Sequence, residues 1–221
     1  MRRQFDHGAP VDPDDERRSA RKRRAILAAA TAAFLQNGYR GTSMDDIAAR
    51  AAVSKQTVYK HFADKASLFS EIVTAAVDEA GDPVHDEVVN LAASADLEGD
   101  LRALARRLLE RVMRPEILQL RRLVIGEASR FPELGRAFYD QGPGRTIAAL
   151  SESFERLADR GILRVDDPCL AAAHFNWLVM SIPLNRAMLL GEDKPASRAE
   201  LRRYGDAGVR AFLGAYGQAA G

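Results

Sequence analysis

The side chains best suited to contact another molecule lie close together, between residues 54 and 65. Within this stretch Val58 and Phe62 are apolar and four residues apart, while Gln56 and Lys60 each lie two residues from Val58. In a helix such positions are about 200° apart, so Gln56 and Lys60 would face outward. An amide can bind an adenine edge through two hydrogen bonds, and an ammonium can bind phosphate or guanine. The pattern indicates nucleic-acid contact, with a plain amphipathic helix as the alternative.

Two short capped helices would position these side chains. Ser43 precedes a helix expected from Met44 to Ala51, and Ser54 precedes another expected from Lys55 to Phe62. A serine at the N-cap accepts a hydrogen bond from a free backbone N–H of the first turn. Two short helices separated by a tight turn are typical of a helix-turn-helix, whose second helix enters the major groove of DNA.

The charge distribution favours a polyanionic partner at this end of the chain. The whole sequence has a net charge of +1, but residues 17–62 hold ten Lys and Arg and two acids, a net of +8. Residues 63–221 hold 20 basic and 24 acidic side chains, a net of −4. The basic run 17–24 could reach the DNA backbone or minor groove, opposed by the acids at 14–16. A solvated helix start is the alternative for this run.

The rest of the composition limits the fold and the function classes. Apolar residues make up 47% of the 221 positions and charged residues 29%, as in globular proteins. Helical periodicity runs nearly throughout, and the alternation typical of strands is absent, so we expect an all-α protein. The lone cysteine, Cys169, excludes an intramolecular disulfide and is expected to be a small buried thiol.

Motifs of catalysis, metal binding and membrane insertion are missing from the sequence. The patterns G-x-S-x-G, C-x-x-C and H-E-x-x-H do not occur, and the four histidines are scattered. We therefore expect no enzyme activity, no metal and no cofactor. The N-terminus lacks the apolar stretch of a signal peptide, and the longest uncharged run is interrupted by polar residues and proline. We expect a cytoplasmic protein without membrane contact.

A resemblance to a known family is carried by residues 26–69, ILAAATAAFLQNGYRGTSMDDIAARAAVSKQTVYKHFADKASLF. This ungapped segment resembles the DNA-binding domain of the TetR family of transcriptional regulators. The landmarks are Phe34 and Gly38, then Thr42-Ser43, Ile47-Ala48, Val53-Ser54, Thr57, Tyr59, His61-Phe62, Lys65 and Leu68-Phe69. One departure is Ala52, where the family's turn usually has glycine. The resemblance implies a dimeric all-α regulator of about nine helices.

The resemblance also implies roles for individual residues. Base-edge contacts are implied for Lys55, Gln56 and Thr57. The expected DNA-binding set is completed by the phosphate contacts Thr42, Tyr59, Lys60, His61 and Lys65, and by the caps Ser43 and Ser54. Thr42 and Lys65 lie at helix starts, where free N–H groups and the helix dipole favour a phosphate. Core packing is the alternative for Tyr59 and for His61.

Three parts of the chain are expected. They are a flexible arm at 1–14, a three-helix helix-turn-helix domain at 15–63, and a helical ligand-binding and dimerisation domain at 64–221. Within the third part, residues 121–146, RRLVIGEASRFPELGRAFYDQGPGRT, resemble the C-terminal domain of the AefR-like branch of the family. Phe131-Pro132 and Gly142-Pro143-Gly144 are expected to break the helices there.

The dimer interface is predicted from a helix that is apolar on all sides. Residues 168–190 have this composition, and such a helix must be covered all round. Pairing across a two-fold axis achieves this. The resemblance implies a bundle of the last two helices, so we place a homodimer interface on 168–190 and 197–217. A monomer with a thick core is the alternative.

An unknown small-molecule effector is expected between the middle helices, in a largely apolar pocket with a few polar groups. The candidate lining residues are Met113, Glu127, Phe138, His174, Asn176 and Trp177. Together these expectations describe a regulator, most simply a repressor, that binds a palindromic operator of double-stranded DNA as a homodimer and is released by the effector. The alternatives are a helical protein-interaction module with a basic start and a small-molecule-binding protein without an operator.

Overall fold

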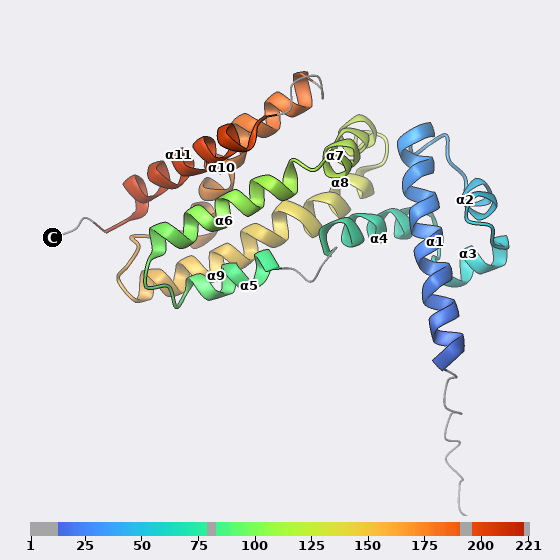
Figure 1. The fold of residues 1–221 in the computed structure, drawn as a ribbon, viewed down its shortest axis with the longest axis horizontal. Helices are drawn as coiled ribbons and strands as arrows, with labels where there is room; N and C mark the ends of the chain where they lie inside the picture. Colours follow the sequence, from blue (N-terminus) through green and yellow to red (C-terminus); the bar gives the residue numbers. More distant parts are fainter. Residues whose placement is uncertain (1–12, 79–82, 191–195, 219–221) are drawn as a thin grey trace, which may run out of the picture. The chain divides into compact units, whose positions relative to one another are not determined.

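The computed structural model describes residues 13–78, 83–190 and 196–218. In this part of the chain the regular structure consists of α-helices α1 to α11 and a π-helical turn, η1, besides one isolated bridge between Leu163 and Gly217 (Figure 1). The all-α prediction is confirmed, with more helices than the nine expected. The chain divides into two compact units, at Ile72 and Val73. The arm expected at 1–14 lies outside the described residues, except for its last two positions, which begin α1.

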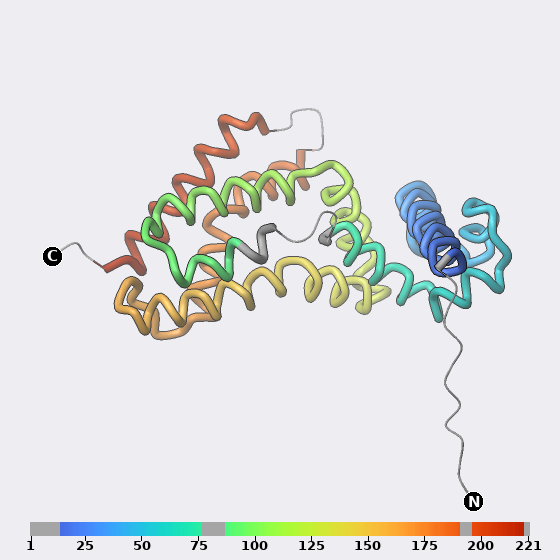
Figure 2. Tube along the Cα trace, turned by 60° about the horizontal axis from the view of Figure 1, so that its bottom comes forward, coloured from blue at the N-terminus to red at the C-terminus, as the bar shows by residue number. Residues whose placement is uncertain are grey.

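The first unit contains α1 (Pro13–Asn37), α2 (Met44–Arg50), α3 (Lys55–His61) and the beginning of α4 (Lys65–Asp78). Helix α1 packs against α2, and α2 against α3 (Figure 2). The core is formed by the apolar faces predicted from the spacing, with Ile26, Val58 and Phe62 buried. Rings of Phe34, Tyr39 and Phe69 gather with centroids 5.4–5.9 Å apart, joining α1 to α4.

The predicted serine caps set the starts of α2 and α3. Ser43 Oγ accepts from the Asp46 N–H at 3.1 Å, and the Asp46 carboxylate accepts from the Ser43 N–H at 3.0 Å. Ser54 Oγ accepts from the Thr57 N–H at 3.1 Å. Between the two helices Ala52 has a φ of 52°, the only positive φ among the described residues other than glycine. A side chain strains this left-handed backbone, which explains why glycine is usual in the family's turn.

The second unit contains the end of α4 and the remaining helices. These are α5 (Pro83–Leu91), α6 (Leu97–Val112), α7 (Pro115–Glu127), α8 (Pro132–Tyr139), η1 (Asp140–Gly144), α9 (Arg145–Asp159), α10 (Pro168–Leu190) and α11 (Arg198–Tyr216). Helix α10 lies between α9 and α11, and α6 packs on α11 (Figure 1). The rings of Phe154, Phe175 and Phe212 meet at the centre of this core.

Two local expectations are wrong. Gly142-Pro143-Gly144 does not break the helix, because η1 carries α8 directly into α9. The wider π turn accommodates a proline ring that an α-helical turn would bring against the carbonyl four residues earlier. Cys169 is exposed rather than buried, at the second position of α10. The break at Phe131-Pro132 is confirmed, since Pro132 begins α8.

Helix α10 is apolar on both of its faces. One face is buried and includes Ala171, Phe175 and Val179. The other face exposes the large apolar side chains of Leu170, Trp177, Leu178, Ile182, Leu189 and Leu190. Among the described helices, none has the length and apolar character needed to cross a lipid bilayer.

Candidate nucleic-acid interface and ligand cavity

The outward face of α3 presents the side chains that the sequence placed there. Val58 is fully buried, while Gln56 and Lys60 are exposed and Tyr59 is 46% exposed. Within the described residues, the side chains of Gln56, Tyr59 and Lys60 form no hydrogen bond or ion pair that would have to break before they contact DNA. The predicted outward orientation of Gln56 and Lys60 is confirmed, and Tyr59 is about half-buried, which leaves part of its ring exposed. This face offers an amide, an ammonium and a phenol to a partner.

Three neighbours on α3 are already engaged with each other or with α2. The Lys55 ammonium lies 2.8 Å from the Asp45 carboxylate, and this contact raises the pKa of Lys55. The hydroxyls of Ser54 and Thr57 are 2.8 Å apart. These contacts are exposed to solvent, so exchanging them for a phosphate or a base costs little.

Thr42 and Lys65 hold the connection between α1 and α2 together. Thr42 is buried, and its one hydroxyl hydrogen is shared between the carbonyl oxygens of Ala33 and Gly38, at 3.1 and 2.9 Å. The Lys65 ammonium donates to the carbonyls of Tyr39 and Thr42 at 2.8 and 2.9 Å. The Thr42 hydroxyl points into the protein, so the expected phosphate contact at the start of α2 cannot come from this hydroxyl and stays a prediction for the backbone N–H groups there. Sequence reasoning missed this loop-holding role, since Lys65 is more than twenty residues from both carbonyls.

His61 is half-buried beside Phe62, with the two ring centroids 6.2 Å apart. Burial lowers the pKa of His61, and the positive charges of Lys60, Arg23 and Lys22 lower it further. The imidazole is therefore neutral at pH 7. A neutral imidazole still has an N–H that can donate to a phosphate oxygen.

The basic run at 17–24 is partly used within the protein. Arg23 forms an ion pair with Glu71 of α4, and its guanidinium lies 5.5 Å from the centroid of the Phe62 ring. Near the start of α1, Asp15 and Glu16 line the same groove as Lys60 and His61 of α3. Asp15 and Glu16 thus lie beside the end of α3, where they oppose a bound phosphate, although Arg18 and Lys22 line the same groove.

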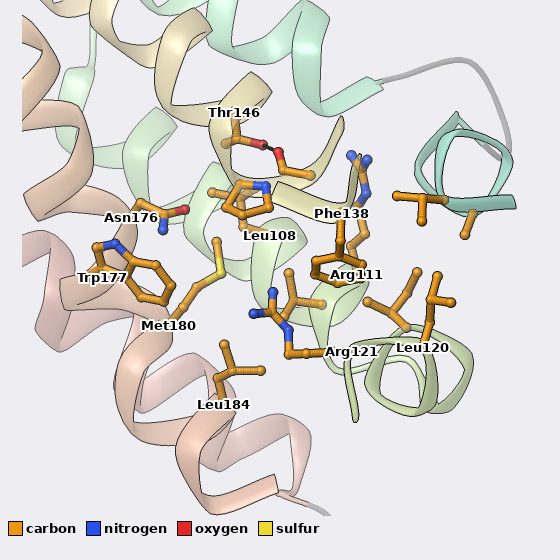
Figure 3. A pocket seen from close by; sticks show the side chains of 16 residues that line it. Leu108, Arg111, Leu120, Arg121, Phe138, Thr146, Asn176, Trp177, Met180 and Leu184 are labelled. Carbon is orange, nitrogen blue, oxygen red and sulfur yellow. Dashed lines mark hydrogen bonds between the residues drawn. The ribbon is translucent and has the colours of Figure 1, made fainter. Parts of the chain in front are cut away.

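The second unit contains a cavity that is partly open to solvent (Figure 3). Its lining comes from the end of α4 and from α6, α7, α8, η1, α9 and α10, and is mostly apolar. The aromatic side chains are Phe138 and Trp177, and the polar ones are Arg111, Arg121, Thr146 and Asn176. The Thr146 hydroxyl is held by the Gly142 carbonyl at 3.3 Å.

Half of the predicted ligand residues line this cavity. Phe138, Asn176 and Trp177 do so, whereas Met113, Glu127 and His174 do not. His174 is two residues before Asn176, which places it about 200° away on the helix. It is exposed there, with its Nδ1 atom 2.6 Å from the Tyr216 hydroxyl.

The other two predicted ligand residues outside the cavity are Met113 and Glu127. Met113 is the C-cap of α6 and packs against the cluster that contains Leu118 and Leu184. Glu127 ends α7, six residues beyond the cavity-lining Arg121, and points to a different side of that helix. The prediction of these residues as ligand contacts is wrong for this cavity.

Two polar groups in the cavity lack partners. Asn176 is only 1% exposed, and neither its amide nitrogen nor its amide oxygen has a hydrogen bond within the described residues. The buried Nε of Arg121 is likewise unpaired, and its guanidinium lies 4.9 Å from the centroid of the Phe138 ring. Burial lowers the pKa of Arg121. Sequence reasoning missed Arg121, because nothing in its neighbourhood distinguishes it from the adjacent Arg122 of the same helix.

Both units match descriptions of one protein family. Residues 26–72 match the description "Bacterial regulatory proteins, tetR family", and residues 99–218 match "AefR-like transcriptional repressor, C-terminal domain". The chain belongs to the TetR family. This TetR-family member is thus a DNA-binding transcription regulator of a repressor branch, and its domains are those of regulators rather than of enzymes.

Similar solved structures cover nearly the whole chain. A protein of Mesorhizobium loti assigned to the TetR family is 47% identical, with a TM-score of 0.79 over 91% of this chain and 99% of the other. The flavonoid-responsive regulator FrrA is 32% identical, with a TM-score of 0.76 over 91% of this chain and 100% of the other. These matches establish the TetR-family architecture for both units.

Curated relatives match over very different shares of their length. The activator FasR of Mycolicibacterium smegmatis is 41% identical over 66 residues, which are 30% of this chain and only 28% of FasR. The repressor SCO4008 of Streptomyces coelicolor is 28% identical over 174 residues, which are 76% of this chain and 83% of SCO4008. Members of the family typically bind DNA and small-molecule effectors as dimers.

Proposed function

We propose that this TetR-family regulator binds a palindromic operator as a homodimer and represses transcription until a small-molecule effector releases it. The observation that carries the proposal is the exposed face of α3, on which Gln56, Tyr59 and Lys60 are free to contact DNA. In this arrangement Gln56 reads a base edge in the major groove, and Lys60 binds the backbone. Lys55 and Thr57 supply further base contacts once DNA replaces their present partners.

Phosphate contacts come from the rim of the same surface. Tyr59 and His61 flank Lys60 at the end of α3, and the neutral imidazole donates an N–H to a phosphate oxygen. Ser43 and Ser54 act mainly through the backbone, because their hydroxyls cap α2 and α3. Lys65 contributes positive charge near the α1–α2 connection while it holds that connection in place.

The homodimer is proposed to form through α10 and α11. The exposed apolar face of α10 supports this, because water would otherwise contact Leu178, Ile182 and Leu189. Covering such a face with a second copy gives a two-fold symmetric interface. A two-fold dimer presents its two α3 helices to half-sites about 34–36 Å apart, one turn of DNA, or a multiple of this.

The effector is proposed to act through α4. This helix begins at Lys65 in the DNA-binding unit, and its later residues Val73 and Ala76 line the cavity. An effector can bind more tightly when α4 lies in a position that keeps the two α3 helices of the dimer from reaching both half-sites. Such an effector weakens DNA binding. A coupling of about 1–3 kcal/mol corresponds to roughly 5- to 150-fold, and DNA weakens the effector by the same factor. The relationship to a regulator named as flavonoid-responsive supports an organic effector.

The test is binding to a palindrome from the DNA upstream of the protein's own coding sequence, measured by fluorescence anisotropy at several salt concentrations. Gln56→Ala should change the preference among operators with single base changes, by a factor that corresponds to about 1–3 kcal/mol at one position. Lys60→Ala should weaken all sequences alike and reduce the salt slope by about one.

Arg156→Ala is the charge-matched control, since Arg156 is exposed on α9 and should leave the anisotropy curves unchanged. Binding of the native chain without any sequence preference would favour a basic interaction module instead. Identical profiles for the Gln56 and Lys60 variants would reject the division of roles between base and phosphate.

A further inference from the structure

The cavity of the second unit has polar groups that the protein itself leaves unsatisfied. Both atoms of the Asn176 amide are without hydrogen bonds in the described part of the chain, and only 1% of the residue is exposed. The Arg121 guanidinium has no ion pair there and rests on the Phe138 ring. A buried polar group without a partner is unfavourable, so such groups mark a place where a ligand supplies the missing partners.

The charges of the lining select the sign of that ligand. Arg111 and Arg121 are the two charged residues that line the cavity, and Asp and Glu are absent from the described lining. Burial lowers the pKa of Arg121, which is the response of a cation that no nearby anion stabilises. An anion would satisfy this guanidinium, whereas a cationic ligand would be repelled by it.

The other side chains that line the cavity are apolar or aromatic, so they favour a ligand with an apolar body. Leu108, Val112, Leu120, Met180 and Leu184 are apolar, and Trp177 and Phe138 add aromatic faces from α10 and α8. Figure 3 shows Asn176 and Arg121 extending into the cavity from different helices, with the apolar side chains between them. A ligand that contacts both polar groups must therefore have an apolar body that spans the space between them.

We propose that the cavity binds an aromatic organic anion, whose acidic group pairs with Arg121 and whose apolar ring system packs against Phe138 and Trp177. A second polar substituent on the ring system would hydrogen-bond to the Asn176 amide, which can both donate and accept. This inference rests on the proposed function in taking the cavity as the effector site, and it names the chemical class of the effector.

The sequence supplies a direct reporter of occupancy. Trp177 is the only tryptophan of the chain and lines the cavity, so its fluorescence responds to a ligand there without any DNA present. Three probes of nearly equal shape test the charge requirement on the full chain: biphenyl-4-carboxylate, biphenyl-4-carboxamide and protonated biphenyl-4-methylamine. The carboxylate should change the Trp177 emission saturably and bind roughly tenfold or more tightly than the carboxamide. The ammonium should bind more weakly than either.

Variants locate the charged contact. Arg121→Met should weaken the carboxylate roughly tenfold or more and bring it to the affinity of the carboxamide, because methionine keeps much of the apolar volume but removes the cation. Arg121→Lys should restore part of the difference. Arg156→Met, at the exposed position on α9, is the control and should change neither probe. Unchanged melting temperatures would show that the variants are folded.

The outcomes separate this inference from the proposed function. Equal binding of carboxylate and carboxamide to the native chain, or an Arg121→Met variant that still prefers the carboxylate, would overturn the anion assignment, as would the absence of any response at Trp177. Operator binding is measured separately by anisotropy. If the carboxylate binds with the expected dependence on Arg121 but leaves operator affinity unchanged, the anion site stands and the release mechanism fails.

Discussion

The two units of the molecule hold their polar side chains in opposite ways. On α3 the side chains either pair with near neighbours, as Lys55 does with Asp45, or extend freely into water, as Gln56 and Lys60 do. In the second unit Asn176 is buried with both amide atoms unpaired, and the half-buried Arg121 has a buried, unpaired Nε. Water satisfies the exposed groups, so an unbound α3 loses little, whereas each unpaired buried group costs about 1–3 kcal/mol. The surface of α3 is therefore stable without DNA. The cavity, by contrast, gains free energy when a ligand pairs with its buried polar groups.

The units also differ in how their apolar surface is covered. In the first unit the aliphatic residues Met44, Ile47 and Val58 of α2 and α3 are buried in its own core. In the second unit, α10 leaves large apolar side chains exposed, among them Leu178 and Ile182. This difference supports the proposal that one unit contacts DNA and the other self-associates, and it leads to the following predictions, ordered by the size of the expected effect.

The largest effect is expected from a charge on the exposed face of α10. Replacing Leu178 and Ile182 together by Asp should give a monomer, because an interface does not tolerate buried unpaired carboxylates. Loss of the second half-site should then weaken operator binding by roughly 100-fold or more. Sedimentation equilibrium and anisotropy measure the two effects. Arg156→Asp on α9 is the control, and a double variant that remains dimeric at micromolar concentration would place the interface elsewhere.

A smaller effect is expected where α11 crosses α10. A Cβ at Gly208 would lie 2.8 Å from the Leu178 carbonyl oxygen, which is backbone and cannot move alone. Gly208→Ala should therefore lower the free energy of unfolding by about 1–2 kcal/mol, as measured in urea. Gly214→Ala in the same helix meets nothing within 4 Å and should be neutral or stabilising by up to about 1 kcal/mol. Equal effects of the two substitutions would contradict the close crossing.

The strained turn of the first unit predicts a gain in stability. Ala52 has a φ of 52°, and glycine adopts this backbone without a steric penalty. Ala52→Gly should raise the free energy of unfolding by about 0.5–1 kcal/mol, after allowance for the greater entropy of the unfolded glycine chain. Ala51→Gly is the control, since Ala51 has a φ of −77° and should lose stability. A loss at both positions would argue against strain at Ala52.

The smallest effect is a pH dependence that arises from His61. Its pKa lies below the usual 6.5 in the free protein, and a neighbouring phosphate would raise it, so a proton is taken up on DNA binding. Operator affinity should therefore rise a few-fold as the pH falls from about 7.5 to 5.5. His61→Gln should flatten this dependence in anisotropy titrations. A variant that keeps the full pH dependence would show that another group takes up the proton.

The same pKa shift predicts the pH dependence of stability, with the opposite sign. Because the folded-state pKa of His61 is lowered, the unfolded chain binds the proton more tightly. The stabilising contribution is thus fully present above pH 6.5 and is lost as the pH falls through the folded-state value. Urea unfolding of the native chain and of His61→Gln across this range measures the difference.

The sequence by itself determined the features that depend on near neighbours. Serine caps three residues before the N–H groups that donate to them, the four-residue spacing of Val58 and Phe62, and Pro132 at a helix start are local rules, and all three are confirmed. Such features follow from helix geometry, which repeats every few residues whatever the rest of the chain does. The helical class and the outward face of α3 were therefore predictable.

The tertiary structure decided which distant residues meet. The ammonium of Lys65 reaches carbonyls of the α1–α2 connection, and the buried hydroxyl of Thr42 turns inward to α1. The cavity is assembled from six helices and η1, so Arg121 enters it while His174 does not. No local pattern encodes these meetings, because they depend on how the helices cross and on which polar groups the packing leaves without partners.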